Sequence, residues 1–319
     1  MKRKTLFLSA VLAAAATLPA LAQEAYPARS VNAIVGFPPG GAADLVTRQL
    51  AESMRSKFPE GIVVVNRPGA SGTNAIASLT RSRPDGYNFA LVPNSNLTIG
   101  PQIQELSYGT PDDYVAVINV VSFAPVLVTR KESPMRSARD IAKAAQAAPG
   151  KISVGYPGEG TVSHLNAEAF KTAAKIQMIN VPFAGWGQAA PALLGGHVDS
   201  MVVQPIEAVQ QRESLNILGS FSKQRQAGLP DVPTFGEQGY DVALEARYLL
   251  IVPKGTPDSI VKYIHDAAQA AMDDPSFKEF VESRGMQPNY QDTGTVQAAL
   301  WDEYKRYTPL LQETNLLKK

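Results

Sequence analysis

The sequence predicts an α/β protein built from two lobes. Strand and helix signals alternate along most of the chain, which is the pattern of a parallel or mixed sheet covered by helices. Four of the strand-to-helix connections are short and rich in glycine, and they fall into two groups, one before and one after about residue 123. Because open α/β sheets bind ligands beyond the carboxyl ends of their strands, we expect the two groups to face one cleft between the lobes.

The first glycine-rich turn, residues 36–44, follows a strand rich in Val and Ile over 30–35. After it, apolar residues recur every four positions over 46–58, as on one face of a helix. The unpaired N–H groups at the start of such a helix, together with its dipole, favour a bound anion. We therefore predict that the backbone of Gly40 and Gly41 holds a carboxylate. The alternative is that these glycines only let the helix pack closely on its strand.

Three further turns repeat this design of strand, small residues and helix start. The second covers residues 67–73, the third 158–161 and the fourth, which is the weakest, 183–187. The third turn has neither the Lys-Ser/Thr pair of a P-loop nor the G-x-G-x-x-G spacing of a dinucleotide fingerprint, so we exclude a nucleotide site there.

The rest of the chain supplies the elements that such turns connect. Strands are expected over residues 61–66, 89–92, 115–121, 126–129, 152–156, 178–181, 201–203 and 249–252. Helices are expected around Ile76 and Leu79, over 139–148, from Ser163 to Phe170, around Leu193 and Leu194, from Ile260 to Ala268 and over 295–311. The strand at 89–92 is expected to end in the small polar group Asn94-Ser95-Asn96.

Residues 1–22 are typical of a secretory signal peptide. Three basic residues precede an apolar run that is shorter than a membrane anchor needs, and Ala20-Leu21-Ala22 forms a small-x-small cleavage site. Three of the 30 basic residues and none of the 29 acidic ones lie in this leader, so the mature net charge is −2 (27 − 29), which argues against nucleic acid as a partner. The sequence contains no cysteine for a disulfide or a lipid anchor. We expect an exported, periplasmic protein.

Seven short motifs occur in one order along nearly the whole mature chain. They are Phe37-Pro38-Pro39-Gly40-Gly41 with Asp44, Asn66-Arg67-Pro68-Gly69-Ala70, Pro84-Asp85-Gly86-Tyr87, Gly158-x-Gly160-Thr161-x-x-His164-Leu165, Val181-Pro182-Phe183, Gly196-x-Val198-Asp199 and Leu229-Pro230-Asp231-Val232-Pro233-Thr234. Each motif alone is weak, but in this order together they resemble the periplasmic receptors of tripartite tricarboxylate transporters, often called Bug-type proteins.

This resemblance implies a two-lobed periplasmic binding protein of the Venus-flytrap type, in which each lobe is a mixed sheet flanked by helices. It implies that residues 23–123 and 245–319 form the first lobe and 124–244 the second, so that the chain crosses between the lobes twice. A small carboxylate, either a dicarboxylate or an aromatic carboxylate, would bind in the cleft and be delivered to the membrane subunits of the transporter. We expect no cofactor, no metal and a monomeric receptor.

Members of this family hold the carboxylate mostly through backbone amides and bridging waters at the first turn, with hydroxyl and amide groups from the second lobe. The ligand-binding residues expected here are Phe37, Gly40, Gly41, Ala70, Gly72, Ser95, Thr161, Ser163, Phe183, Ala184, Trp186 and Asp199. The chain departs from the family at Trp186, because relatives commonly carry an aromatic-Lys-Gly run in this region. If Trp186 faces the cleft, the ligand is more apolar or aromatic than malate or citrate; the alternative is a tryptophan that caps the surface.

Other functions stay open from the sequence. One is an exported esterase or amidase, although Ser71 and Ser163 do not lie in G-x-S-x-G elbows and no base is placed beside them. Another is a solute sensor that signals through a receptor kinase. His164 and Glu168 lie four residues apart on one helix, but two residues do not make a metal site. Asp44 is expected to cap its helix, unless the ligand carries an amine.

Overall fold

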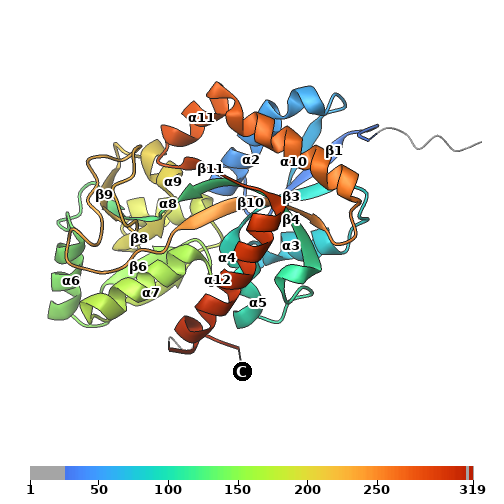
Figure 1. Cartoon of the computed structure of the whole chain (residues 1–319). Coiled ribbons are helices and arrows are strands. Elements are labelled where there is room, and N and C mark those ends of the chain that lie inside the picture. The colour runs from blue at the N-terminus through green and yellow to red at the C-terminus, as the bar shows by residue number, and fades with distance from the viewer. Residues whose placement is uncertain (1–25, 314–315, 319) are drawn as a thin grey trace, which may run out of the picture.

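The computed structural model describes residues 26–313 and 316–318, so the predicted signal peptide, residues 1–22, lies outside the described residues. The described chain forms two lobes, each a mixed sheet flanked by helices (Figure 1). This confirms the predicted fold class. None of the helices in the described part of the chain is long and apolar enough to cross a membrane.

The first lobe contains a six-stranded sheet in the order β11-β4-β10-β3-β1-β2. Its strands are β1 (Val31–Val35), β2 (Ile62–Asn66), β3 (Asn88–Pro93), β4 (Tyr114–Phe123), β10 (Ala246–Pro253) and β11 (Gln287–Gln291). β1 pairs in parallel with β2 and β3, whereas β10 is antiparallel to β3 and β4. The parallel strands β1, β2 and β3 therefore end at one edge of the sheet, where the first two glycine-rich turns begin.

The second lobe contains a five-stranded sheet in the order β7-β6-β8-β5-β9. Its strands are β5 (Val126–Arg130), β6 (Ser153–Tyr156), β7 (Ile179–Pro182), β8 (Ser200–Val203) and β9 (Leu215–Ser220). β6 pairs in parallel with both β7 and β8, and β5 is antiparallel to β8 and β9. The carboxyl ends of β6, β7 and β8 consequently meet at one edge, where the third and fourth turns follow.

The helices connect and cover these strands. They are α2 (Ala42–Ser53), α3 (Thr73–Thr80), α4 (Asn94–Thr98), α5 (Gly100–Ile103), α6 (Ala138–Ala147), α7 (Val162–Ala174), α8 (Trp186–Leu194), α9 (Pro205–Gln210), α10 (Asp258–Asp273), α11 (Pro275–Glu282) and α12 (Thr293–Glu313). In the first lobe α2 and α10 cover one face of the sheet, and α3 and α12 cover the other. In the second lobe α6 and α7 lie on one face, and α8 lies on the other.

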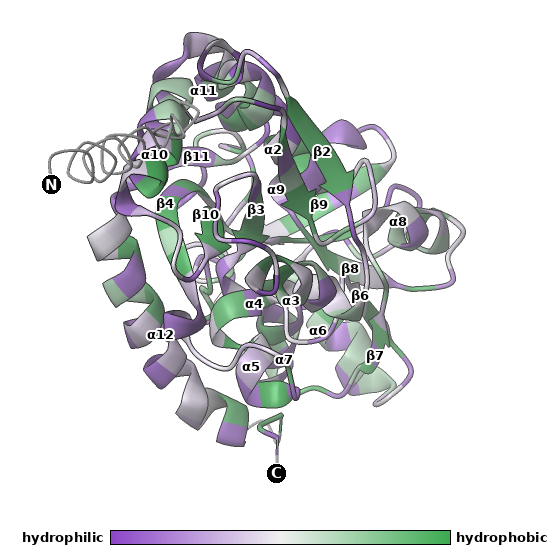
Figure 2. Cartoon of the chain, turned by 90° about the vertical axis from the view of Figure 1, so that its right-hand side faces the viewer, coloured by the Kyte–Doolittle hydropathy of each residue, from purple (hydrophilic) through white to green (hydrophobic). Residues whose placement is uncertain are grey.

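Apolar side chains fill the space between each sheet and its helices, and the strands are the most apolar part of the chain in Figure 2. The apolar cluster on the α2 side of the first lobe also contains Val162 of α7 and Ile206 of α9, which belong to the second lobe. The two lobes therefore lie directly against each other.

The chain passes between the sheets twice, and the two passages lie side by side. β4 ends at Phe123 and leads into β5, and β10 begins at Ala246, the antiparallel partner of Phe123. The side-chain amide of Gln226 brackets the first passage: its oxygen accepts from the N–H of Ala124 at 3.4 Å, and its nitrogen donates to the carbonyl of Ala124 at 3.2 Å. α12 packs on β4 and α4 of the first lobe. The residue boundaries assigned to the lobes stay a prediction.

One local expectation was wrong. Asn94-Ser95-Asn96 begins α4 rather than ending the preceding strand, and all three side chains are buried. Asn94 is held by tertiary partners, since its side chain donates to Glu303 at 2.9 Å and accepts from the N–H of Arg247 at 3.2 Å. Those partners come from distant parts of the chain, so a local pattern cannot reveal them.

Candidate functional site

A small cavity of about 30 Å³ lies between the lobes, with room for about two water molecules. Its lining residues are Phe37, Pro38, Gly41, Ala42, Ala43, Pro93, Ser95, Phe123, Pro157, Thr161, Val162, Gly185, Trp186, Gln204, Glu207, Ala246 and Tyr248. They come from both lobes and from both passages between them. A ligand held here would contact both lobes and both passages between them.

Five helices begin at this cavity, and three of them, α2, α7 and α8, are longer than two turns. α2 starts after Gly41 and α7 starts after Thr161, while α8 starts after Gly185, and each of these residues lines the cavity. The first N–H groups of a helix lack intrahelical acceptors, and the helix dipole adds positive potential at the same end. None of the 17 lining residues is Lys, Arg or His. The positive potential of the cavity therefore comes from backbone rather than from basic side chains.

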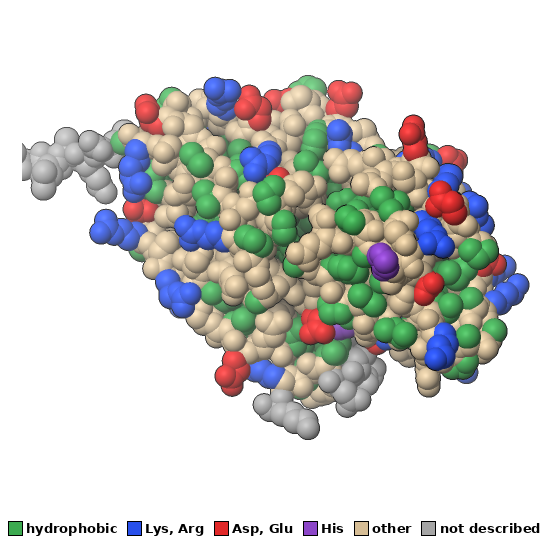
Figure 3. All heavy atoms as spheres, turned by 180° about the vertical axis from the view of Figure 1, so that it is seen from behind, with side chains coloured by type: hydrophobic (Ala, Val, Ile, Leu, Met, Phe, Trp, Pro, Cys, Tyr) green, Lys and Arg blue, Asp and Glu red, His purple; other side chains and the backbone are tan. Residues whose placement is uncertain are grey.

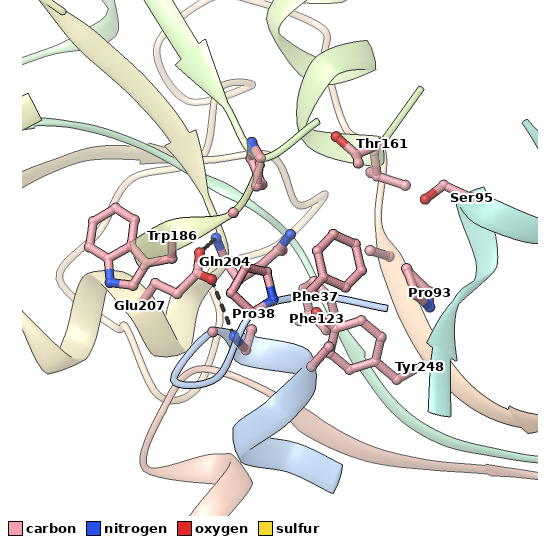
Figure 4. A pocket seen from close by; sticks show the side chains of 17 residues that line it. Phe37, Pro38, Pro93, Ser95, Phe123, Thr161, Trp186, Gln204, Glu207 and Tyr248 are labelled. Carbon is pink, nitrogen blue, oxygen red and sulfur yellow. Dashed lines mark hydrogen bonds between the residues drawn. The ribbon is translucent and has the colours of Figure 1, made fainter. Parts of the chain in front are cut away.

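Aromatic rings form one wall of the cavity. Figure 4 shows Phe37 and Phe123 grouped with Tyr248, and the ring centroids of Phe123 and Tyr248 are 4.9 Å apart. Trp186 lies on the opposite side, beside Glu207 and Pro38, and is only 7% exposed. The structure thus decides between the two interpretations of Trp186: it lines the cavity and does not cap the surface.

Asp44 secures the first turn. Its carboxylate accepts hydrogen bonds from the N–H of Gly40 at 3.0 Å, from Nε of Arg48 at 2.9 Å and from Nδ2 of Asn66 at 2.8 Å. Burial acts to raise the pKa of Asp44, but the hydrogen bonds from Arg48, Gly40 and Asn66 outweigh it and lower the pKa. Asp44 therefore holds the loop in place, and its oxygens are already paired within the chain.

An Asp44→Asn variant is expected to lose about 1–3 kcal/mol of unfolding free energy at pH 7, because a charged acceptor of three hydrogen bonds is removed. Since the folded-state pKa is depressed, this contribution is present above the ordinary pKa of an aspartate and is lost as the pH falls through the folded value. Urea titrations of both proteins at neutral and acidic pH measure the difference. Asp302→Asn, on the exposed face of α12, serves as the control. A loss for Asp44→Asn that is independent of pH would contradict the assignment.

Glu207 is a cavity residue that the sequence analysis did not find. It is the third residue of α9, is 3% exposed, and its Oε2 accepts from the N–H of Gln204 at 3.1 Å. Its Oε1 reaches across to the other lobe and accepts from the N–H of Ala42, the first residue of α2, at 3.2 Å. Burial raises the pKa of Glu207 to about 7, against the lowering effect of these two hydrogen bonds. The pattern Gln204-Pro205-x-Glu207 is a helix-start signal, but nothing local shows that its carboxylate faces another lobe.

Five of the predicted ligand-binding residues line the cavity: Phe37, Gly41, Ser95, Thr161 and Trp186. The hydroxyl of Ser95 has no hydrogen-bond partner among the described residues, so it is available to a ligand. The hydroxyl of Thr161 is engaged, because it donates to the carbonyl of Gly158 and accepts from the N–H of His164. Thr161 therefore orders the start of α7 and presents backbone to the cavity.

Several of the other predicted residues lie just behind this lining. Gly72 packs against Phe37, since a Cβ atom there would lie 2.9 Å from the Phe37 ring. Ser163 is fully buried and accepts from Nε2 of Gln204 at 3.4 Å, so it positions a lining residue. Phe183 is half-buried against Gly155 of β6. These residues support the cavity wall without forming it.

The remaining predicted residues lie away from this cavity. Gly40, Ala70 and Ala184 are exposed and do not line the cavity. Asp199 lies at the other end of the second sheet, where its carboxylate accepts from the N–H of Ser153 at 2.8 Å and from its hydroxyl at 2.7 Å. Ser153 begins β6, whereas the cavity lies beyond the end of that strand. Asp199 therefore joins β6 to β8 and does not line this cavity.

Glycines permit the close approach of the lobes. A Cβ atom at Gly158, whose φ is +100°, would lie 2.6 Å from the hydroxyl oxygen of Ser71 in the other lobe. A Cβ atom at Gly185 would lie 3.0 Å from Cδ of Pro38, also across the interface. Side chains at these two positions would hold the lobes apart. Glycine at both positions therefore lets the lobes approach each other closely.

Comparison with known proteins identifies the family of this chain. Residues 46–316 match the family described as the tripartite tricarboxylate transporter family receptor, TctC. The chain belongs to this family. A relative from Cupriavidus necator, the UPF0065 protein in the gbd 5' region, is 29% identical over 326 residues, which cover 100% of this chain and 99% of the relative. The resemblance found in the sequence motifs is confirmed.

Two solved structures share the fold of this TctC receptor. The periplasmic binding protein BugD matches with a TM-score of 0.87 at 29% identity, covering 92% of this chain and 100% of its own. MatC from Rhodopseudomonas palustris, solved with bound malate, matches with a TM-score of 0.84 at 25% identity, covering 90% of this chain and 100% of its own.

The serines weighed as nucleophiles in this TctC receptor have no histidine partner. Neither Ser71 nor Ser163 makes a hydrogen bond to a histidine in the part of the chain that the structure describes. His164 instead stacks on Tyr156 with ring centroids 4.4 Å apart, and its Nδ1 accepts from the N–H of Gly160 at 3.2 Å. His164 therefore supports the third turn and is not oriented as a general base.

Proposed function

We propose that this TctC-family receptor captures a small carboxylate in the interlobe cavity, without chemical conversion, and presents it to the membrane subunits of a tripartite transporter. The observation that carries this proposal is the meeting of three helix starts, those of α2, α7 and α8, at one cavity without basic side chains. Backbone N–H groups at helix starts bind carboxylates without further machinery. MatC, a relative of the same fold, was solved with malate, which supports a carboxylate as the ligand.

The proposal places the mature receptor in the periplasm as a monomer, after removal of residues 1–22. A nucleic-acid partner is disfavoured because Lys and Arg side chains are dispersed among Asp and Glu on the face shown in Figure 3 and form no basic patch there. Closure of the lobes over the ligand would create the surface that the membrane subunits recognise.

Thermal unfolding of the mature chain with a panel of carboxylic acids tests the proposal. A ligand that binds only the folded state raises its stability by about 2.7 kcal/mol at a concentration of 100 times Kd, so the melting temperature should rise for at least one acid. The methyl esters of the same acids are the control, because they keep the body of the ligand and lose its charge. Absence of a shift with every acid, or hydrolysis of the esters by the protein, would contradict the proposed function.

A further inference from the structure

In the part of the chain that the structure describes, the carboxylate of Glu207 in the cavity has no cationic partner. Its two oxygens accept only backbone N–H groups, those of Ala42 and Gln204, and no lining residue is basic. On β10 it faces Tyr248, a neutral phenol whose pKa is raised by burial and, to a lesser degree, by the charge of Glu207. On α2 the nearest acidic group is Asp44, whose oxygens are turned to Arg48 and Asn66. A ligand therefore meets an unneutralised acidic group in this cavity.

We propose that Glu207 determines the specificity of this site: its carboxylate excludes ligands that carry a second carboxylate, so that the receptor takes monocarboxylates with an apolar, preferably aromatic, body. This inference rests on the proposed function, since it assumes that a carboxylate binds in the interlobe cavity. It chooses between the two ligand classes that the sequence left open, the dicarboxylates and the aromatic carboxylates.

The ligand carboxylate has a place away from Glu207, at the start of α7. Glu207 already occupies the N–H of Ala42. The N–H of Val162, the first residue of α7, donates to no acceptor among the described residues, and the hydroxyl of Ser95 is unpaired as well; both residues line the cavity, and Ser95 and Thr161 lie on the side away from Glu207 in Figure 4. A second carboxylate directed at the start of α2 would meet Glu207, and the rest of the lining nearby is largely aromatic and aliphatic, from Phe37, Phe123 and Trp186.

The charge of Glu207 increases the expected difference in affinity between monocarboxylates and dicarboxylates. Like charges placed next to each other across an interface weaken association strongly, above all where water is excluded. A monocarboxylate can turn its apolar end toward Glu207, whereas a dicarboxylate of similar length must bring a negative group near it. Because burial raises the pKa of Glu207 to about 7, the discrimination should be full at pH 8 and reduced at pH 6, where this carboxyl is mostly protonated.

Calorimetric titration with two matched pairs, benzoate against terephthalate and hexanoate against adipate, tests this assignment. The wild type at pH 8 is expected to bind the monocarboxylate of at least one pair about tenfold or more tightly than its dicarboxylate partner. In Glu207→Gln, which keeps the shape of the side chain and loses its charge, the ratio should fall to about threefold or less, mainly through tighter dicarboxylate binding. Glu213→Gln removes the same charge from an exposed position just after α9 and should leave the ratio unchanged.

The wild type provides a second measurement that needs no variant, because the same ratio should shrink between pH 8 and pH 6 while the ligands remain largely ionised. The inference is overturned if terephthalate and adipate bind the wild type at pH 8 as tightly as their partners, or if the ratio is the same in Glu207→Gln and at both pH values. Failure of both monocarboxylates and both dicarboxylates to bind any of the proteins would instead remove the proposed function, and this inference with it.

Discussion

Gly41→Val is expected to weaken binding of the preferred carboxylate about a hundredfold, which corresponds to about 2.8 kcal/mol, while the unfolding midpoint of the ligand-free protein stays nearly unchanged. The backbone of Gly41 is extended, with φ −80° and ψ 169°, so any residue can adopt it. A Cβ atom there would lie 3.7 Å from Oε1 of Glu207, in ordinary contact. The two methyl groups of valine would extend beyond that point into a cavity of only about 30 Å³ and keep the lobes from closing on a ligand.

Gly187→Val is the matched control for this prediction. Gly187 lies in α8, one residue beyond the cavity-lining Trp186, and a Cβ atom there meets nothing within 4 Å. The control variant should therefore bind the carboxylate like the wild type. Calorimetry gives Kd and thermal unfolding gives the midpoint for both variants. Equal affinities of Gly41→Val and wild type would remove the first turn from the binding site.

Phe235→Ala is expected to lower the free energy of unfolding by about 3–5 kcal/mol, a large part of the total for a protein of this kind. Phe235 is fully buried in the second lobe, stacked on Phe221 with ring centroids 3.9 Å apart and edge-on to Phe170 at 5.0 Å. Removing its ring leaves a cavity among aromatic neighbours that are fixed by the sheet and by α7, so the space cannot close without strain.

Urea denaturation of the ligand-free protein measures the effect of Phe235→Ala. Tyr290→Ala serves for comparison, because Tyr290 is an aromatic residue that is 47% exposed on β11, and its loss should cost about 1 kcal/mol or less. Comparable losses in the two variants would show that the Phe235 cluster does not hold the second lobe together. Because the chain has two lobes, the transition should be followed both by fluorescence and by circular dichroism to establish whether it is two-state.

The sequence predicts the elements whose patterns are local. The strand before the first turn, β1, and the helix after it, α2, are marked by residue type and by spacing, and so is α7 after the third turn. Elements that depend on a distant partner were not predicted. β11 has the polar sequence QPNYQ and becomes a strand only because it pairs with β4, and α9 is a single short helix whose first turn is fixed by contacts across the lobe interface.

The same limit applies to the candidate site. Phe37, Gly41 and Thr161 were predicted because each belongs to a turn with a recognisable design. Glu207 and Tyr248 were not, because one lies in an ordinary helix start and the other in the middle of an apolar strand. Glu207 and Tyr248 become neighbours of the turns only because the two lobes face each other in the folded chain. The turns that we propose to bind the carboxylate were thus readable from the sequence, whereas Glu207, which we propose to select among carboxylates, was not.

The side-by-side passages between the lobes have a mechanical consequence. Two adjacent antiparallel segments, joined through the pairing of Phe123 with Ala246, resist sliding and shear of one lobe against the other but allow rotation about the line that joins them. We therefore expect the relative motion of the lobes to be mainly a rotation. Phe123 and Ala246 also line the cavity, so a ligand bound there would lie close to the axis of this rotation. A change of a few tenths of an ångström beside this rotation axis becomes a displacement several times larger at the outer rims of the lobes.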